Sequence, residues 1–114
     1  MLDKITSEQL QSYVEPAAPS RIKVIMVPLE SDPFVVEIDS DLETLQERVG
    51  GPLEHRAIAQ LQLVCNYAGQ VLDLPLNRHI QGRPVYGEFF LCRHDSLGNH
   101  ISVTPSDIET LLGE

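Results

Sequence analysis

The stretch D-S-D-L-E-T-L-Q-E-R-V-G-G-P, from Asp39 to Pro52, carries the clearest start and stop signals in this sequence of 114 residues. It predicts a helix from Ser40 to Val49. Ser40 is placed to cap the free amides of the first turn, and Glu43, three residues later, to reach back to it as in a capping box. After the helix, Gly50-Gly51-Pro52 provides a left-handed exit and then a stop. We expect the rest of the chain to fold around this helix.

The predicted helix has a single apolar side. Leu42, Leu45 and Val49 recur at i, i+3 and i+7, while charged residues occupy the other faces. Apolar runs typical of strands precede and follow the helix in the sequence. We therefore expect the helix to bury this side against a sheet formed by those runs.

Strands are predicted on both sides of the helix. Arg21–Leu29 is apolar and β-branched with little alternation, which favours a strand buried on both faces at the centre of the sheet. A turn at Glu30–Pro33 leads into Phe34–Ile38, so these two runs form a hairpin. A polar loop follows the helix, and Gly87 marks a bulge or a close backbone approach in the longest of the later strands. The later strands are expected at Leu61–Cys65, Gln70–Leu74, Val85–Arg93 and His100–Val103.

Short helices are predicted at both ends of the chain. Met1–Val14 is amphipathic and opens with a capping pattern, and the prolines of Glu15–Ser20 make that segment an extended linker. The first helix docks either on its own domain or on a second subunit, and the sequence does not decide between them. Thr104–Asp107 combines a cap, a first-turn proline and an acid, and so opens a C-terminal helix.

The order of these elements predicts the fold class. A hairpin, a helix and three further strands are typical of an α+β, β-grasp-like (ubiquitin-like) fold, with one helix across a mixed sheet of about five strands. The chain divides into the N-terminal helix and linker at residues 1–20 and a single domain at residues 21–114. With 42% hydrophobic residues, it has enough apolar content for a modest core.

Charge and composition narrow the range of functions. The net charge is −9, which disfavours binding to nucleic acid or to an anionic membrane. Glu30–Glu54 contains eight acids and one base, a net charge of −7 in this segment. No apolar run approaches the roughly 20 residues needed to cross a bilayer, so we expect a cytoplasmic protein. Cys65 and Cys92 lie in apolar runs and are expected as buried thiols, without a disulfide.

Catalytic and metal-binding patterns are weak. His94, Asp95 and His100 surround one turn, but we interpret them as solvated surface side chains. Ser96 lacks the context of a nucleophile elbow. The pair Gly50-Gly51 leaves a helix, whereas a phosphate-binding loop enters one. We therefore expect a protein that is not an enzyme and needs neither metal nor cofactor.

The stretch around Asn77 and Arg78 is the most distinctive polar feature. In one interpretation these side chains bond to backbone groups of neighbouring turns. In the other they form a recognition pair, because Asn offers a donor and an acceptor and Arg a planar fork for carboxylate or phosphate. With His79 and Arg83 they form the basic cluster of the sequence, where a small anionic ligand would bind.

Several sequence blocks resemble a known family. K-V-I-M-V, E-I-D-S-D-L-E-T-L-Q-E-R-V-G-G, L-V-C-N-Y-A-G, L-P-L-N-R, G-E-F-F-L-C-R and T-P-S-D-I are similar, in this order, to the domain of unknown function 3846 family. Its members are small proteins of bacteria, phages and mobile elements. The resemblance covers Lys23 to Leu112 and implies no reaction. The matching positions are Asp41, Leu42, Leu45, Gly50, Gly51, Cys65, Asn66, Gly69, Leu74, Pro75, Asn77, Arg78, Gly87 and Phe90.

Two functional hypotheses follow from charge and resemblance together. The first is an acidic interaction protein that binds a basic protein partner through the helix 40–50 face, as a phage or mobile-element accessory or counter-defence (anti-defence) factor. Its predicted partner-binding residues are Glu37, Asp39, Asp41, Glu43 and Glu47. The alternative is a protein that binds a small anionic or nucleotide-like molecule. Its predicted ligand-binding residues are Asn77, Arg78, His79 and Arg83.

Overall fold

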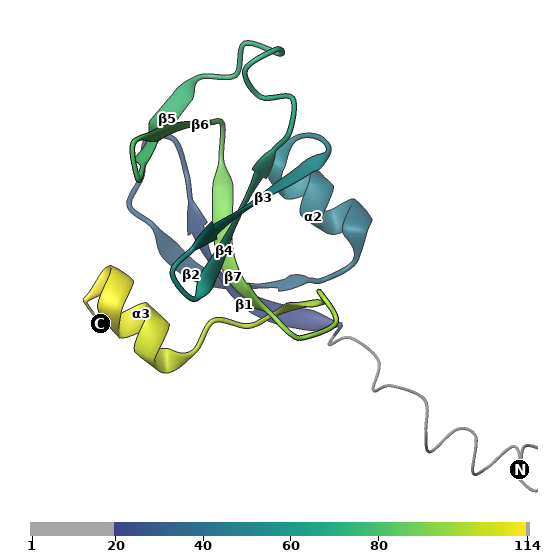
Figure 1. Ribbon diagram of the computed structural model, residues 1–114, viewed down its shortest axis with the longest axis vertical. Helices are drawn as coiled ribbons and strands as arrows, with labels where there is room; N and C mark the ends of the chain where they lie inside the picture. Colours follow the sequence, from purple (N-terminus) through teal and green to yellow (C-terminus); the bar gives the residue numbers. More distant parts are fainter. Residues whose placement is uncertain (1–19, 114) are drawn as a thin grey trace, which may run out of the picture.

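The computed structural model describes residues 20–113, of which 45% lie in strands and 17% in helices. Within this range the strands form a six-stranded antiparallel sheet and a separate two-stranded hairpin, and two short helices accompany them (Figure 1). The predicted helix Met1–Val14 and most of the predicted linker lie outside the described residues. The elements are β1 (Arg21–Val27), β2 (Phe34–Asp39), α2 (Leu42–Val49), β3 (Leu53–Ile58), β4 (Leu61–Asn66), β5 (Leu76–Ile80), β6 (Arg83–Tyr86), β7 (Phe89–His94), β8 (His100–Ile101) and α3 (Pro105–Leu112).

The main sheet has the strand order β2-β1-β7-β4-β3, and β8 pairs with the end of β7. The predicted hairpin of β1 and β2 is confirmed, with Ile22 opposite Ile38. The predicted mixed, β-grasp-like sheet is wrong, because every strand pairing in this sheet is antiparallel. β7, rather than β1, lies at its centre. The polar residues 53–58, which we expected as a loop, instead form β3 and add a hairpin with β4 at the far edge.

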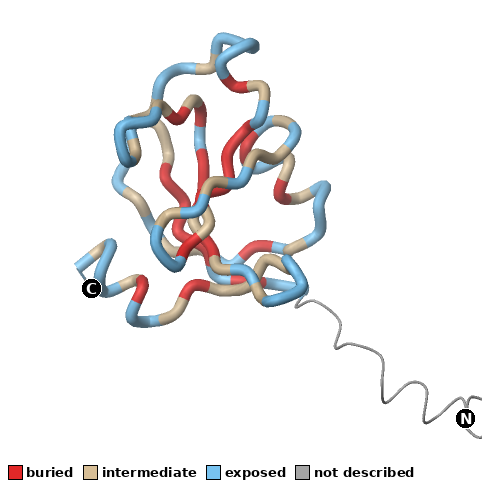
Figure 2. Tube along the Cα trace, in the orientation of Figure 1, coloured by how far each residue is buried: buried red, intermediate tan, exposed pale blue. Residues whose placement is uncertain are grey.

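The sheet buries apolar residues on both faces, since successive residues of a strand point to opposite sides. On one face, Val24 and Phe90 pack against Leu45 and Val49 of α2. On the other face a second core includes Val85 of β6 and side chains of α3. Buried segments run along the central strands (Figure 2), between α2 on one side and the β5–β6 hairpin on the other (Figure 1). We call these the α2 face and the hairpin face.

Helix α2 begins later than predicted. Asp41, not Ser40, is the N-cap, and its carboxylate accepts from the Thr44 backbone amide at 3.0 Å. The left-handed exit at Gly50 is confirmed. Leu42 is 59% exposed, so the buried stripe consists of Leu45 and Val49 alone. Asp and Ser are both strong caps, and the sequence offers them side by side, which is why the start was misplaced by one residue.

The segment between β4 and β7 was predicted least well. Gln70–Leu74, expected as a strand, is a series of turns, whereas the polar residues after it form the β5–β6 hairpin. The predicted strand Val85–Arg93 is split into β6 and β7 at Gly87, which has a φ of 78°. A Cβ at Gly87 would lie 2.9 Å from Leu74 Cδ1, so the predicted close approach is confirmed. Prolines, and the exposure of the hairpin formed by β5 and β6, obscure the alternation of apolar and polar residues in this segment.

The C-terminal helix and the cysteines match their predictions. Thr104 caps α3 with a complete capping box to Asp107. Cys65 and Cys92 are free and buried, and burial raises the pKa of the Cys92 thiol to about 12. In residues 20–113 both helices are eight residues long, and neither has the length and apolarity to span a bilayer.

Two asparagines at positions of the family resemblance stabilise turns. Asn66 donates to the Val49 carbonyl and accepts from the Ala68 amide, and so links the end of α2 to the turn after β4. Asn77 donates to the carbonyls of Val27 and Gly87 at 3.0 Å each. Both asparagines therefore fix the backbone of the segments that connect the strands.

Candidate functional site

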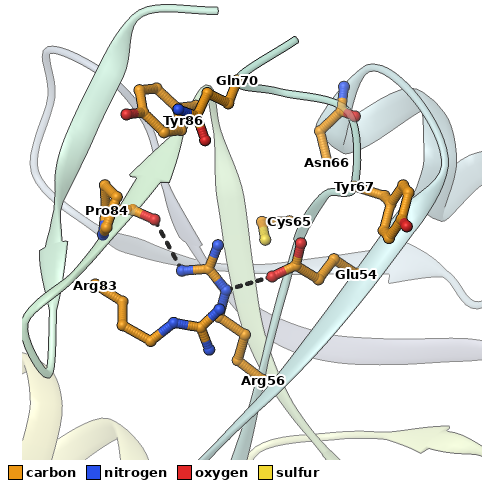
Figure 3. A pocket seen from close by; sticks show the side chains of 9 residues that line it. All are labelled: Glu54, Arg56, Cys65, Asn66, Tyr67, Gln70, Arg83, Pro84 and Tyr86. Carbon is orange, nitrogen blue, oxygen red and sulfur yellow. Dashed lines mark hydrogen bonds and ion pairs between the residues drawn. The ribbon is translucent and has the colours of Figure 1, made fainter.

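A cavity of about 320 Å³ lies at the edge of the hairpin face, between β3, the turn after β4, and β6 (Figure 3). Its chemistry differs from that of the adjacent core, because its lining is mainly polar. We call it the arginine cavity, after two guanidinium groups that reach it from different elements. It is lined by Glu54, Arg56, Cys65, Asn66, Tyr67, Gln70, Arg83, Pro84 and Tyr86.

Strand geometry places these side chains. Glu54 and Arg56 are two residues apart on β3 and therefore project to the same face, towards the β5–β6 hairpin. Cys65 stands opposite Glu54 in the β3–β4 register and lies at the base of the cavity. Arg83 begins β6 and extends from the hairpin towards Arg56 (Figure 3). The cavity therefore forms where the hairpin overhangs the edge of the sheet.

The charges in the arginine cavity do not balance. Arg56 Nε donates to Glu54 Oε2 at 2.5 Å, and Arg56 Nη1 donates to the Pro84 carbonyl at 2.8 Å. The side chains of Arg56 and Glu54 are only 16% and 26% exposed, respectively. The side chain of Arg83 makes no hydrogen bond or ion pair with another residue in 20–113. Two guanidinium groups and one carboxylate leave one net positive charge, within a protein whose total charge is −9.

Two tyrosine rings and a glutamine amide form further walls of the arginine cavity. Tyr86 and Tyr67 stand on opposite sides of the arginine cavity, and Tyr67 is 71% exposed (Figure 3). The Gln70 side chain makes no hydrogen bond with another described residue, so its amide can donate and accept within the cavity. Burial raises the pKa of the Cys65 thiol, which keeps it protonated.

The five acids predicted as a partner-binding surface are divided between the two faces. Glu37 and Asp39 share a side of β2 with Val35, which packs in the core of the hairpin face. Both carboxylates lie near Arg21, with Asp39 Oδ1 2.9 Å from Nη1. Asp41, at the start of α2, accepts from Thr44, which lowers its pKa. The remaining two, Glu43 and Glu47, are exposed on α2 and form no ion pair within residues 20–113.

The four residues predicted to bind a small ligand are also separated. Asn77 bonds to backbone carbonyls, which confirms the first interpretation of this residue. Arg78 Nε donates to Asn77 Oδ1, and its side chain lines an apolar groove beside α3. His79 is exposed on β5. Of the four, Arg83 alone reaches the arginine cavity.

Most of the residues that line this cavity could not be predicted from the sequence. Glu54 and Arg56 were assigned to a loop, because L-E-H-R-A-I has three polar residues in succession and lacks the alternation of a half-buried strand. Gln70, Tyr67 and Tyr86 left no signal either, since their convergence depends on how the turn and the hairpin fold over the sheet.

A second pocket, of about 260 Å³, is lined by three histidines together with Gln62 and Gly98. We call it the histidine pocket. Burial is the main cause that lowers the pKa of His55 and of His100, and the charge of His94 lowers both further. Asp95 does not join them, because its carboxylate accepts from the Leu97 and Asn99 amides in its own turn. The interpretation of His100 as a solvated side chain is wrong, since it is partly buried against His55.

The fold and the arginine cavity define a small antiparallel β protein with a compact polar pocket at a sheet edge. Residues 22–114 match the family described as Domain of unknown function (DUF3846). The chain belongs to this family, which confirms the resemblance read from its sequence blocks. No curated protein and no solved structure gave a match to the chain.

Proposed function

We propose that this protein binds a small anionic ligand in the arginine cavity. The observation that carries this proposal is the convergence of Arg56 and Arg83 on one cavity that contains a single carboxylate, Glu54. Arg83 is exposed at the cavity, and a guanidinium without an acidic partner favours an anion as its counter-charge. The rest of the protein is acidic, so anions would not collect at this place through net charge.

The size and the walls of the cavity support a particular class of ligand. A volume of about 320 Å³ is at the lower end of the range for small-molecule sites, and suits a metabolite rather than a polymer. The guanidinium fork of Arg83 matches a carboxylate or phosphate group. Tyr67 and Tyr86 offer aromatic surface to a planar group. The class is therefore a small molecule that joins an anionic group to a planar one, such as a nucleoside monophosphate.

We propose binding rather than catalysis. Burial keeps the Cys65 thiol protonated, and a thiol is a poor nucleophile in that form. Glu54 is engaged by Arg56 and is not placed as a free base. The ligand would act as a signal or cargo that the domain senses or holds.

A matched pair of variants on one hairpin tests this function. Arg83→Gln removes the cavity's unpaired charge, whereas Arg78→Gln removes the same charge from a different place, the apolar groove beside α3. We expect thermal-shift and calorimetric titration with adenosine monophosphate, phosphate and benzoate to detect binding of at least one of them. The Arg83→Gln variant should lose this binding and the Arg78→Gln variant should keep it. Equal binding by both variants, or no binding of any of these anions by the wild type, would overturn the proposal.

An acidic interaction surface is a second candidate, now restricted to α2. Glu43 and Glu47 are exposed on this helix and form no ion pair in the described part of the chain, which favours a basic protein partner at this place. Cytoplasmic location and an anti-defence role in phages or mobile elements stay predictions that rest on composition and family resemblance.

The test of this second candidate compares two double charge reversals. Glu43→Lys with Glu47→Lys, and Glu30→Lys with Asp32→Lys, bring the protein to the same net charge at different places. A specific partner should be captured from host lysate at low salt, be released at high salt, and be lost only by the α2 variant. Equal capture by the two variants would refute a surface centred on α2.

A further inference from the structure

Three of the four histidines of this chain meet at one pocket, although they come from three strands. His55 lies on β3, His94 ends β7 and His100 begins β8. In the sheet order β4 and β7 separate β3 from β8. The twist of the sheet nevertheless brings the rings of His55 and His100 to a centroid distance of 5.0 Å. This arrangement is independent of the arginine cavity, which lies on the other face.

The contact between these two rings is made by their Nε2 atoms, which lie 2.8 Å apart. In the hydrogen bond one Nε2 donates and the other offers its lone pair, so at least one ring is neutral. No ion pair among residues 20–113 includes a histidine. The pocket therefore concentrates imidazole nitrogens without a carboxylate to balance a positive imidazolium.

We propose that His55 and His100 form a binding site for a divalent transition-metal ion such as Zn²⁺ or Ni²⁺, with His94 as a third imidazole at the rim. Imidazole nitrogen is a preferred ligand of these ions, whereas Mg²⁺ and Ca²⁺ select oxygen. The absence of a carboxylate in the pocket lining therefore selects the class of metal.

The separation of the two nitrogens is close to what such an ion needs. Two Zn–N bonds of about 2.0–2.1 Å at a tetrahedral angle place the nitrogens about 3.3 Å apart. At a centroid distance of 5.0 Å the two Nε2 atoms, 2.8 Å apart, point almost directly at each other. Both rings must therefore tilt, and the nitrogens must separate by about half an ångström, before both lone pairs point at one ion. As the side chains stand in residues 20–113, no group of three or more His, Cys, Asp or Glu could hold a metal ion. His94 is exposed, and it would join the pair by rotating its side chain, while water completes the coordination.

The test uses full-length, metal-free protein without a histidine tag. Calorimetric titration with Zn²⁺ and with Ni²⁺ should give one equivalent of binding, and Mg²⁺ should give none. His55→Gln and His100→Gln should each weaken binding at least about tenfold, since even outer-sphere partners of a metal contribute that much. His79, the fourth histidine, is exposed on β5. The His79→Gln variant should therefore bind Zn²⁺ and Ni²⁺ as the wild type does.

The absorption spectrum of the Co²⁺ form adds a readout that folding alone would not move. We expect nitrogen and oxygen ligation without a thiolate charge-transfer band, because both cysteines are buried. Circular dichroism tests whether each variant is folded. Because His55→Gln and His100→Gln are separate variants, one of them still tests the site if the other does not fold. No Zn²⁺ or Ni²⁺ binding by the wild type, equal losses in His79→Gln and His55→Gln, or a thiolate band would overturn the proposal.

Discussion

The arginine cavity and the histidine pocket are built from the same strand but differ in chemistry. Along β3, Glu54 and Arg56 project to the hairpin face, and His55 between them projects to the α2 face. The first site contains an ion pair and one surplus cation. The second contains imidazole nitrogens without a carboxylate. One short strand thus contributes to both proposed sites, one for an anion and one for a cation, because alternation places neighbours in sequence on opposite faces of the sheet.

The largest expected effect is a loss of stability where α2 packs against the sheet. Leu45→Ala should lower the free energy of unfolding by about 2–5 kcal/mol, since Leu45 is buried in the core between α2 and the sheet. Leu42→Ala, on the same helix but 59% exposed, should cost less than about 0.5 kcal/mol. Urea unfolding of both variants measures the difference. Similar losses in the two would mean that α2 packs through its predicted three-residue stripe.

The hairpin face depends on an ion pair that holds α3 to β7. Arg93 donates to both carboxylate oxygens of Asp107, at 2.6 and 2.7 Å, and Asp107 also accepts from the Thr104 amide. Asp107→Asn should lower the free energy of unfolding by about 1–3 kcal/mol, because it weakens these bonds at a buried position. Chemical denaturation at neutral pH measures the loss. Asp32→Asn, in the exposed connection between β1 and β2, is the control.

The same carboxylate predicts a pH dependence. The hydrogen bond from Arg93 is the main cause that lowers the pKa of Asp107 to about 2 from its ordinary value of 3.8. Because the folded state holds the proton less tightly, this contribution is complete above the unfolded pKa and is lost as the pH falls towards 2. The wild type should lose stability across this window, and Asp107→Asn should lose less. Parallel acid-unfolding curves for the two proteins would contradict this assignment.

The smallest expected effect on stability separates the two arginines of the cavity. Arg56→Gln should destabilise the fold by about 1–3 kcal/mol, because it leaves the Glu54 carboxylate half-buried without its partner. Arg83→Gln should change stability by less than about 0.5 kcal/mol, since Arg83 has no such partner in the described residues. Thermal and urea unfolding without ligand compare the two. A large loss in Arg83→Gln would mean that this residue serves the fold rather than a ligand.

Much of the fold was predictable where the signals are local. The β1–β2 hairpin follows from two apolar runs around a turn, the end of α2 from Gly50, and α3 from its capping box. In each case residues within a few positions decide the backbone conformation. The weakly amphipathic strands β3 and β5 were missed, and β6 was predicted only in part, as the start of the strand Val85–Arg93. Their polar residues become strand residues only when paired with a neighbour.

The sequence by itself determined the turn between β1 and β2, the end of α2 at Gly50, the start of α3 and the burial of the cysteines, since these depend on short-range backbone preferences and apolar runs. Tertiary structure alone decided the sheet order, the face on which each charged residue lies, and both sites. Arg56 meets the Pro84 carbonyl 28 positions away, and His55 meets His100 at a separation of 45. Such contacts follow from strand register and sheet twist, which are set by packing the whole core at once.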